Sequence, residues 1–274
     1  MLPRRQQSSA TFRPIGSVVH AAEVLEAVAA EHRPIGVNEL ARRVGLDASS
    51  VSRIVRTLEL YRLLAREPGT NRVRLGMGLV LLASDVLHGL DIRRAAAAEL
   101  DRLSADTHET INLAVWDEDG PLIVDHRPGS QPIAALGEIG RRDPAHATSL
   151  GKALLAFKPA ASERAVAHGR PERFTPTTIT DATALGEELA GIRRRGYAVN
   201  RGELRAELYA VAAPIFGLDD EVVAALGVAG PASRFTEERM TQLADVVRDA
   251  ASAVSRALGA GPAAGHGTGV AGRP

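Results

Sequence analysis

The sequence predicts an α+β chain with two domains, and three observations support this prediction. Helical periodicity dominates the chain from about residue 15 to residue 60. From Ile111 onward, stretches with strand character alternate with helical ones and are joined by short turns. Residues 1–78 carry 12 basic and 7 acidic residues, whereas the remainder carries 21 basic and 26 acidic residues. These counts indicate a basic N-terminal domain and an acidic C-terminal domain, and only the basic domain suits contact with phosphate.

The sequence at the N-terminal end predicts a disordered arm followed by a helix. Residues 1–14 are polar, contain arginines and two prolines, and are expected to form a disordered arm. A helix is expected over residues 18–31, with Ser17 as its cap and Arg33-Pro34 beyond its end. Its expected inner face comprises Val18, Ala22, Leu25 and Ala29.

The stretch 37–58 predicts two short helices joined by a tight turn. The apolar residues that repeat at helical spacing are Leu40 and Val44 in the first helix, and Val51, Ile54, Val55 and Leu58 in the second. Gly45 lies between them, where the backbone can turn through a positive φ at little cost. Asp47 or Ser49 is placed to cap the second helix.

With its apolar residues buried, the second helix presents hydroxyls and arginines to solvent. The outward residues are Ser49, Ser50, Ser52, Arg53 and Arg56, and no carboxylate follows until Glu59. This face suits a DNA major groove, because arginine binds guanine edges or phosphate and serine binds phosphate oxygens or base edges. Arg42 of the first helix is expected to contact DNA as well. The alternative is an ordinary solvated helix face in an α-hairpin.

Residues 63–75 predict a two-stranded hairpin around the turn-forming tetrapeptide Pro68-Gly69-Thr70-Asn71. Three helices followed by such a hairpin are typical of a winged helix-turn-helix, which we expect over residues 15–78. Arg66, Arg72 and Arg74 of the hairpin are placed to grip backbone phosphate. Alternatively, they are edge-strand charges that discourage aggregation.

Beyond the hairpin we expect a linker helix, residues 79–91, and a second domain, residues 92–258. The linker is apolar enough that we expect it to pack against a partner subunit. The sequence of the second domain predicts an antiparallel meander with helices at its start, middle and end. The expected caps of these helices are Thr148 or Ser149, Thr180 or Asp181, and Thr236. That architecture often holds a small molecule between the sheet and a covering helix. Residues 259–274 are low-complexity and expected to be disordered.

Motifs for catalysis and for metal or cofactor binding are missing from the sequence. Gly151-Lys152 lacks the earlier glycine and the following Ser or Thr of a phosphate loop, and His108-Glu109 lacks the second histidine of a zinc protease motif. The chain contains no cysteine, which suits a reducing cytoplasm. No apolar run reaches transmembrane length. We therefore expect a cytoplasmic protein that is not an enzyme, with no metal, no cofactor and no membrane partner.

Residues 16–258 resemble the IclR-type transcriptional regulators. The matching pieces, in this order, are GVNELARRVGLDASSVSRIVRTLE, VRLG, HATSLGKALLA, TITD, IRRRGYAVNRGE, VAAPIF and ALGVAGP. The resemblance implies an N-terminal winged helix-turn-helix, a linker helix and a C-terminal effector-binding domain of the GAF-like, profilin-like kind. It also implies homodimers, often paired as tetramers, that bind palindromic double-stranded DNA operators.

The resemblance further implies an effector pocket in the second domain. Carried over to this chain, its residues are Leu136, Thr148, Ser149, Leu150, Asn200, Glu203, Leu208, Ala210, Gly227 and Ala229. Many effectors in the family are small organic acids, and a helix beginning near Thr148 could receive a carboxylate. Because Ala210, Gly227 and Ala229 lack the Cys or Ser groups of members that bind very small oxo-acids, we expect an aromatic or longer aliphatic acid.

These expectations combine into a ligand-responsive transcription factor. An effector that prefers one conformer of the second domain shifts the spacing of the two DNA-binding heads in a dimer. The alternative is a small-molecule sensor whose N-terminal domain contacts other proteins instead of DNA.

Overall fold

The computed structural model describes residues 14–31, 33–88, 91–131, 137–162 and 171–261. Most of the expected N-terminal arm, Leu136, and the expected tail from residue 262 lie outside the described residues. The chain divides into two compact units, the N-terminal unit (Met1–Gly89) and the C-terminal unit (Leu90–Pro274). Among the described helices, none combines the length and apolarity needed to cross a lipid bilayer.

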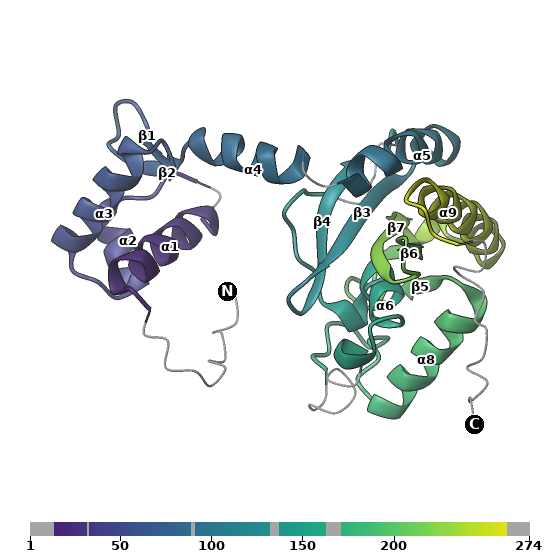
Figure 1. The fold of residues 1–274 in the computed structure, drawn as a ribbon. Coiled ribbons are helices and arrows are strands. Elements are labelled where there is room, and N and C mark those ends of the chain that lie inside the picture. The colour runs from purple at the N-terminus through teal and green to yellow at the C-terminus, as the bar shows by residue number, and fades with distance from the viewer. Residues whose placement is uncertain (1–13, 32, 89–90, 132–136, 163–170, 262–274) are drawn as a thin grey trace, which may run out of the picture. The chain divides into compact units, whose positions relative to one another are not determined.

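The N-terminal unit is a winged helix-turn-helix followed by one further helix (Figure 1). Its elements are α1 (Gly16–Ala29), α2 (Val37–Val44), α3 (Ala48–Leu60), β1 (Leu64–Arg66), β2 (Val73–Leu75) and α4 (Gly78–His88). Strands β1 and β2 pair antiparallel, and Ile35 adds a bridge to Val73. The core of this unit includes Leu40, Val51 and Val55, so the expected apolar stripe of α3 is confirmed.

The inner face of α1 differs from the prediction by a one-residue shift. Val24 and Val28 are buried, whereas Val18 is 63% exposed. The helix begins at Gly16 with Ile15 as its N-cap, so Ser17 lies inside the helix and does not cap it. Because α1 is apolar around most of its circumference, two adjacent rows of side chains have helical spacing, and the periodicity cannot choose between them. Packing against α2 and α3 selects the row with Val24 and Val28.

The turn between α2 and α3 has the glycine and the helix cap that the sequence predicts. Gly45 ends α2 in the left-handed conformation, at φ 70°, which a residue with a Cβ adopts only at a cost. Asp47 caps α3 by accepting a hydrogen bond from the backbone N–H of Ser50. These two residues set the angle at which α3 leaves α2.

The C-terminal unit is a five-stranded antiparallel sheet between helices. Its strands are β3 (Thr110–Asp117), β4 (Gly120–Arg127), β5 (Ala198–Arg201), β6 (Leu208–Phe216) and β7 (Val222–Pro231), in the order β4-β3-β7-β6-β5. Its helices are α5 (Asp91–Thr107), α6 (Ser149–Leu155), α8 (Ala182–Arg195) and α9 (Glu237–Ala257), with 3-10 turns η1 (Ala145–Ala147) and η2 (Ala232–Arg234). Helices α5 and α9 cover one face of the sheet, and α6 and α8 cover the other (Figure 1).

The helix caps of this unit agree with the sequence. Thr148, Asp181 and Thr236 each accept a backbone N–H at the start of α6, α8 and α9. Three residues of the expected disordered tail, Gly259 to Gly261, are instead hydrogen-bonded to the end of α9 and to Asp220. The ordered chain therefore continues past residue 258.

The loop before α6 was not expected to add to the sheet, yet it does. The backbone of Ile123 on β4 exchanges hydrogen bonds with Gly140 and Arg141, and Leu122 forms a bridge with Arg142. Strand β4 is an edge strand, so this loop satisfies backbone groups that would otherwise be unpaired. The pairing also fixes the position of residues 141–143 beside the α6 face of the sheet.

Candidate nucleic-acid interface and ligand pocket

Helix α3 begins with a charged cap that also engages one of the predicted DNA contacts. The Ser49 hydroxyl donates to Oδ1 of Asp47 at 2.6 Å, and the Ser50 N–H donates to the same oxygen at 2.8 Å. The hydrogen bonds from Ser49 and Ser50 hold the pKa of Asp47 well below its usual range. Since the Ser49 hydroxyl hydrogen is already donated, Ser49 supports the cap and can offer DNA only its oxygen lone pairs.

Asp47→Ala is expected to lower the melting temperature of the N-terminal unit at pH 7, because α3 loses its cap and the charge at its N-terminus. The pKa of Asp47 is lower in the folded chain than in the unfolded chain. Its stabilising effect is therefore complete at neutral pH and is lost as the pH falls below about 4 toward the folded pKa. Melting curves by circular dichroism should show a smaller difference between wild type and variant at pH 3 than at pH 7. Asp47→Ser, which keeps an uncharged cap, is the control, and a difference that grows in acid would contradict this role.

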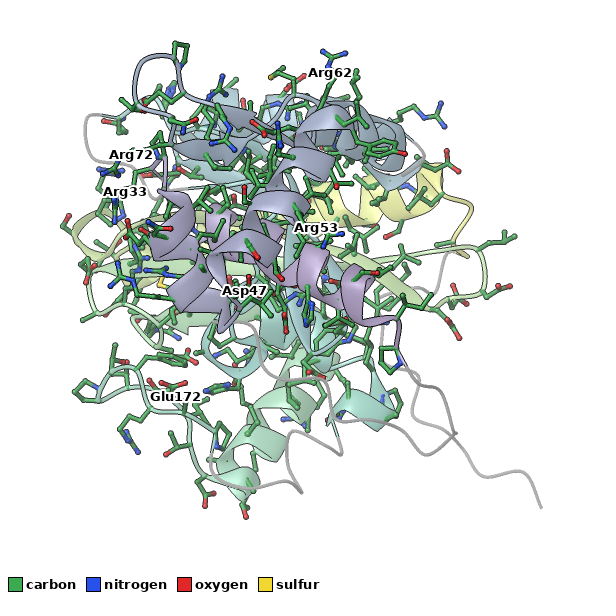
Figure 2. The ribbon with its side chains drawn as sticks, turned by 90° about the vertical axis from the view of Figure 1, so that its left-hand side faces the viewer. Arg33, Asp47, Arg53, Arg62, Arg72 and Glu172 are labelled. Atoms are coloured by element: carbon green, nitrogen blue, oxygen red, sulfur yellow. The ribbon has the colours of Figure 1, made fainter. Side chains whose placement is uncertain are left out.

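The arginines of the predicted DNA-binding face are exposed and available. Arg42, Arg53 and Arg56 are exposed, and none has a side-chain partner among the residues that the structure describes. Glu59, the first carboxylate along α3, is neutralised by Arg66 at 3.0 Å. In Figure 2 the N-terminal unit faces the viewer, and Asp47, Arg53 and Arg72 are labelled on it. Within the described residues, this face therefore carries arginines without acidic partners, and the carboxylate of Glu59 in α3 is paired.

An open hollow joins part of this face to the wing. It is lined by Val37, Asn38, Ala48, Ser49, Ser52, Arg56, Arg66 and Asn71. The predicted residues Ser49, Ser52 and Arg56 thus lie together, whereas Arg42, Ser50 and Arg53 lie outside the lining. Asn38 and Asn71 were not predicted, because a single amide gives no signal of its own, and the fold brings both of them to α3.

The wing arginines differ in how they are held. Arg66 donates to the backbone and side-chain oxygens of Asn71 and pairs with Glu59, so it is fixed across the hairpin. Arg72 and Arg74 are exposed, and among the described residues they donate only to backbone carbonyls, Arg72 to Pro34 at 3.2 Å and Arg74 to Leu75 at 3.5 Å. Both keep guanidinium hydrogens for phosphate.

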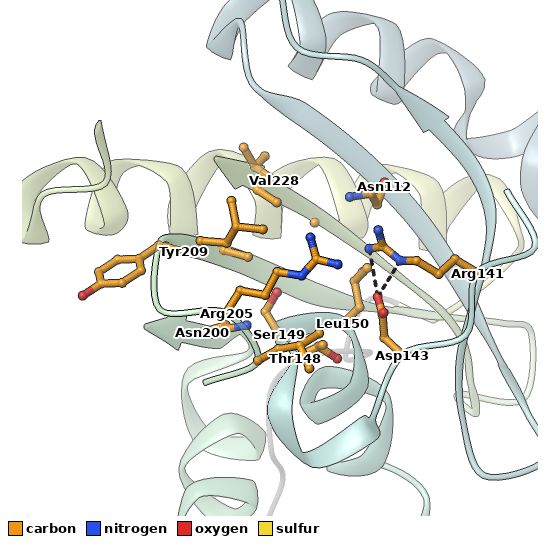
Figure 3. Close-up of a pocket in the computed structure, with 15 residues that line it drawn as sticks. Asn112, Arg141, Asp143, Thr148, Ser149, Leu150, Asn200, Arg205, Tyr209 and Val228 are labelled. Atoms are coloured by element: carbon orange, nitrogen blue, oxygen red, sulfur yellow. Dashed lines mark hydrogen bonds and ion pairs between the residues drawn. The ribbon is translucent and has the colours of Figure 1, made fainter. Parts of the chain in front are cut away.

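The C-terminal unit contains a pocket on the α6 face of its sheet (Figure 3). Its volume is about 660 Å³ with the open mouth included. The lining residues are Asn112, Arg141, Asp143, Thr148, Ser149, Leu150, Asn200, Leu204, Arg205, Leu208, Tyr209, Ala210, Gly227, Val228 and Ala229. Eight of the ten predicted effector residues are among them, the exceptions being Glu203 and Leu136, and Leu136 lies outside the described residues.

Small residues make the floor of the pocket. Ala210 pairs with Ala229, and Gly227 pairs with Asn112, so all four residues lie on the α6 face of neighbouring strands. A Cβ at Gly227 would lie 2.9 Å from the carbonyl oxygen of Val211, too close for any side chain without a backbone shift. The space above these strands is therefore left open by the absence of side-chain volume.

Glu203 lies beneath the pocket instead of lining it. Both of its carboxylate oxygens accept hydrogen bonds from Nζ of Lys152, at 2.6 and 2.8 Å. Burial raises the pKa of Glu203, and the Lys152 ammonium opposes that rise. Glu203 was predicted as an effector contact, but this carboxylate is committed to the lysine of α6 and instead ties that helix to the loop after β5.

Asn200 and Thr148 line the pocket while supporting its wall. The Asn200 amide donates to the carbonyl of Ala147 at 3.1 Å and accepts the N–H of Glu203 at 2.8 Å. The Thr148 hydroxyl donates to Pro144 and caps the N–H of Gly151. Their polar groups are therefore largely occupied within the protein.

The charged residues of the lining were not predicted. Arg141 and Asp143 come from the loop that pairs with β4, and Arg205 comes from the loop between β5 and β6. Arg141 donates to Oδ2 of Asp143 from Nε at 3.2 Å and from Nη2 at 3.0 Å. Arg205 has no side-chain partner among the residues that the structure describes. Asn112 adds a buried Oδ1 that lacks a hydrogen-bond partner within the described part of the chain.

Family models match both units of the chain. A model described as the IclR helix-turn-helix domain matches residues 17–68, and one described as the bacterial transcriptional regulator IclR C-terminal matches residues 84–256. The glycerol operon regulatory protein of Streptomyces griseus is 34% identical over 251 residues, covering 91% of this chain and 98% of that protein. The HTH-type transcriptional regulator XynR of Escherichia coli is 31% identical over 246 residues, covering 89% of this chain and 98% of XynR.

Solved structures of similar proteins have the same fold. The Thermotoga maritima IclR structure matches with a TM-score of 0.75 and 29% identity, covering 89% of this chain and 99% of that one. An IclR homolog from Microbacterium hydrocarbonoxydans, crystallised in complex with 4-hydroxybenzoate, matches with a TM-score of 0.79 and 28% identity, covering 88% and 98% of the two chains. The arginine face of α3, the pocket beneath α6 and these matches lead to one conclusion: the chain belongs to the IclR family of transcriptional regulators.

Proposed function

We propose that this chain controls transcription by binding operator DNA through α3 and the wing, and that a small organic acid in the pocket of the C-terminal unit changes that binding. The observation that carries the proposal is the pocket itself, which combines an apolar, small-residue floor with an unpaired arginine at its mouth. A concave site with a mostly apolar lining and a few converging polar groups is typical of small-molecule binding, and cationic side chains select anionic ligands. The effector acts by binding one conformer more tightly than the other.

An aromatic or longer aliphatic acid fits the pocket best. Ala210, Gly227 and Ala229 contribute almost no volume and no hydrogen-bonding side chain, so the floor accepts an apolar body. The bound 4-hydroxybenzoate of the Microbacterium homolog is an aromatic acid and supports this class. The first turn of α6, which is expected to receive the carboxylate, borders the pocket; Thr148 occupies the N–H of Gly151 there, and the arginine side of the pocket offers full positive charges as well.

We propose that the chain is a homodimer, paired in some states as a tetramer, that binds a palindromic operator in the cytoplasm. The exposed apolar side chains of the N-terminal unit support self-association. They include Ile15 and Val18 near the start of α1, and Val80, Leu81 and Leu82 on α4. Contiguous exposed apolar side chains usually mark a protein interface. We propose no catalytic activity, cofactor or resident metal for it.

Ala229→Leu is expected to abolish the response to effector while leaving DNA binding intact. Ala229 lies on β7 at the pocket floor, and leucine there would occupy the space of the ligand. The test is a gel-shift titration with the DNA upstream of the chain's own gene, with and without aromatic and longer aliphatic acids, each acid also being tested for thermal stabilisation. Ala184→Leu, on the exposed first turn of α8, is the matched control.

The outcome separates this proposal from a sensor that acts through protein contacts. We expect wild type and both variants to bind the upstream DNA, and an acid to alter binding by wild type and Ala184→Leu only. Absence of DNA binding by the wild type would favour the protein-contact alternative. Stabilisation only by two- or three-carbon acids would contradict the proposed ligand class.

A further inference from the structure

The two arginines of the pocket are presented toward the same space from opposite walls. Figure 3 shows Arg141 and Arg205 extending into the pocket from different segments, with Arg141 paired to Asp143. Two guanidinium groups and one carboxylate leave the lining with a formal charge of +1, and the other lining residues are uncharged at neutral pH. Arg205, which has no side-chain partner in the described part of the chain, is placed to bind an anion there.

The backbone two to three residues before Arg205 is held by several contacts. Its neighbour Glu203 is bound to the buried Lys152, and Oγ1 of Thr178 donates to the Glu203 carbonyl at 2.6 Å. Oγ1 of Thr175 donates to the carbonyl of Gly202 at 2.7 Å, and Gly202 adopts φ 76° to make the turn. These contacts hold the start of the loop that carries Arg205 to the pocket.

Asp143 lines the pocket and also limits the negative charge that a ligand can carry there. Its carboxylate shares Oδ2 between two nitrogens of Arg141, which neutralises one of the two pocket arginines. A ligand with a single negative charge balances the remaining +1. A second carboxylate on the ligand would leave the occupied pocket with a net negative charge, because Asp143 already offsets Arg141, and binding would be weaker.

We propose that the pocket binds a monocarboxylate through Arg205 together with Arg141, and that Asp143 excludes dicarboxylates. This inference rests on the proposed function and names the residues that select the ligand by charge. Arg205, which has no ion pair among the described residues, gains one in the complex, and Arg141 supplies the opposite wall. The apolar floor then contacts the rest of the acid.

The test uses ligands that share one body and differ in charge. One set is 4-hydroxybenzoate, 4-hydroxybenzamide and benzene-1,4-dicarboxylate; the other is hexanoate, hexanamide and hexanedioate. Dissociation constants are measured by isothermal titration calorimetry with the full-length chain at pH 7. We expect wild type to bind the monoacid of at least one set about tenfold or more tightly than its amide and its diacid, because a charge-assisted hydrogen bond favours the anion by that order.

Two substitutions assign that selectivity to residues. Arg205→Gln is expected to bring the ratio of monoacid to amide affinity close to one, and Asp143→Asn is expected to raise diacid affinity several-fold. Arg194→Gln is the matched control: Arg194 is exposed on α8, lies outside this pocket, and has no side-chain partner among the described residues. Because each readout is a ratio of affinities in one protein, a general loss of stability does not mimic it.

Each result has one meaning for the proposal. Amides that bind wild type as tightly as their acids, acids that do not bind at all, or an Arg205→Gln variant that keeps its preference for the monoacid would overturn it. An unchanged diacid affinity in Asp143→Asn would overturn the role given to Asp143. A neutral ligand that binds the pocket and changes DNA binding would refute the charge selection but would leave ligand-controlled DNA binding intact. Absence of DNA binding by the wild type would refute the proposed function itself.

Discussion

Replacing Lys152 by alanine is expected to lower the free energy of unfolding of the C-terminal unit by about 3–5 kcal/mol. The Lys152 side chain is 1% exposed, and its ammonium binds both oxygens of Glu203, which is 6% exposed. Without the ammonium, a carboxylate remains buried with its main counter-charge removed. Urea denaturation followed by the fluorescence of Trp116 measures this directly, because the chain has one tryptophan and it lies on β3 of this unit.

The pH dependence of that loss gives an internal check. Burial already raises the pKa of Glu203, and Lys152 is the main group that opposes the rise, so the alanine variant should raise the pKa further. A carboxyl whose pKa is higher in the folded chain than in the unfolded chain destabilises the fold as the pH rises above its unfolded value, about 4.3. The deficit of Lys152→Ala should therefore be largest at neutral pH and shrink toward pH 4.

A double substitution separates charge from packing. Lys152→Met combined with Glu203→Leu removes both charges and keeps apolar volume, so it is expected to recover most of the stability lost by Lys152→Ala. A loss below about 1 kcal/mol in Lys152→Ala would mean that water solvates the Glu203 carboxylate once the lysine is gone. A deficit that stays constant between pH 7 and pH 4 would show that lost packing, and not an unpaired carboxylate, is its cause.

Local signals in the sequence were sufficient for most elements of the fold. Gly45 and Asp47 mark the turn between α2 and α3, and Thr148, Asp181 and Thr236 cap the helices that the sequence places after them. Each signal acts through atoms within four residues of itself, so it needs no knowledge of the tertiary structure. The row of side chains that α1 buries was mispredicted because that choice depends on what α1 packs against.

Some residues of the pocket could be expected from the sequence, and others could not. Its floor and its α6 wall lie on segments that carry the resemblance to the family, and the resemblance implied Ser149, Leu150 and Ala210, which line the pocket. Arg141, Asp143 and Arg205 lie on irregular segments, and only the pairing of the first loop with β4 and the anchoring of Glu203 bring them together. For Glu203 the sequence indicated the right neighbourhood but not the direction of the side chain, which points to Lys152. The residues proposed to select the ligand are thus the ones that local pattern could not supply.

The double variant Arg53→Ala/Arg56→Ala is expected to weaken operator binding by tenfold or more at about 0.1 M salt, because it removes two unpaired cations from the exposed face of α3. Each arginine that meets a phosphate contributes roughly 0.9 to the slope of log affinity against log salt concentration, so the slope should become shallower by up to about two. An arginine that binds a guanine edge would instead relax sequence preference at one base pair. Gel-shift titrations at several salt concentrations distinguish these two contributions.

The control for this variant is Arg62→Ala, at the turn that follows α3. Arg62, labelled in Figure 2, is exposed and lacks a side-chain partner within the described residues. It does not line the hollow between α3 and the wing. It already adopts φ 60°, a strain that alanine shares, so the substitution removes a charge without changing the backbone demand. Ligand affinity of the C-terminal unit should be unchanged in both variants. If Arg62→Ala weakened DNA binding as much as the double variant, the effect would reflect net charge alone, and α3 would lose its assignment as the surface that reads the operator.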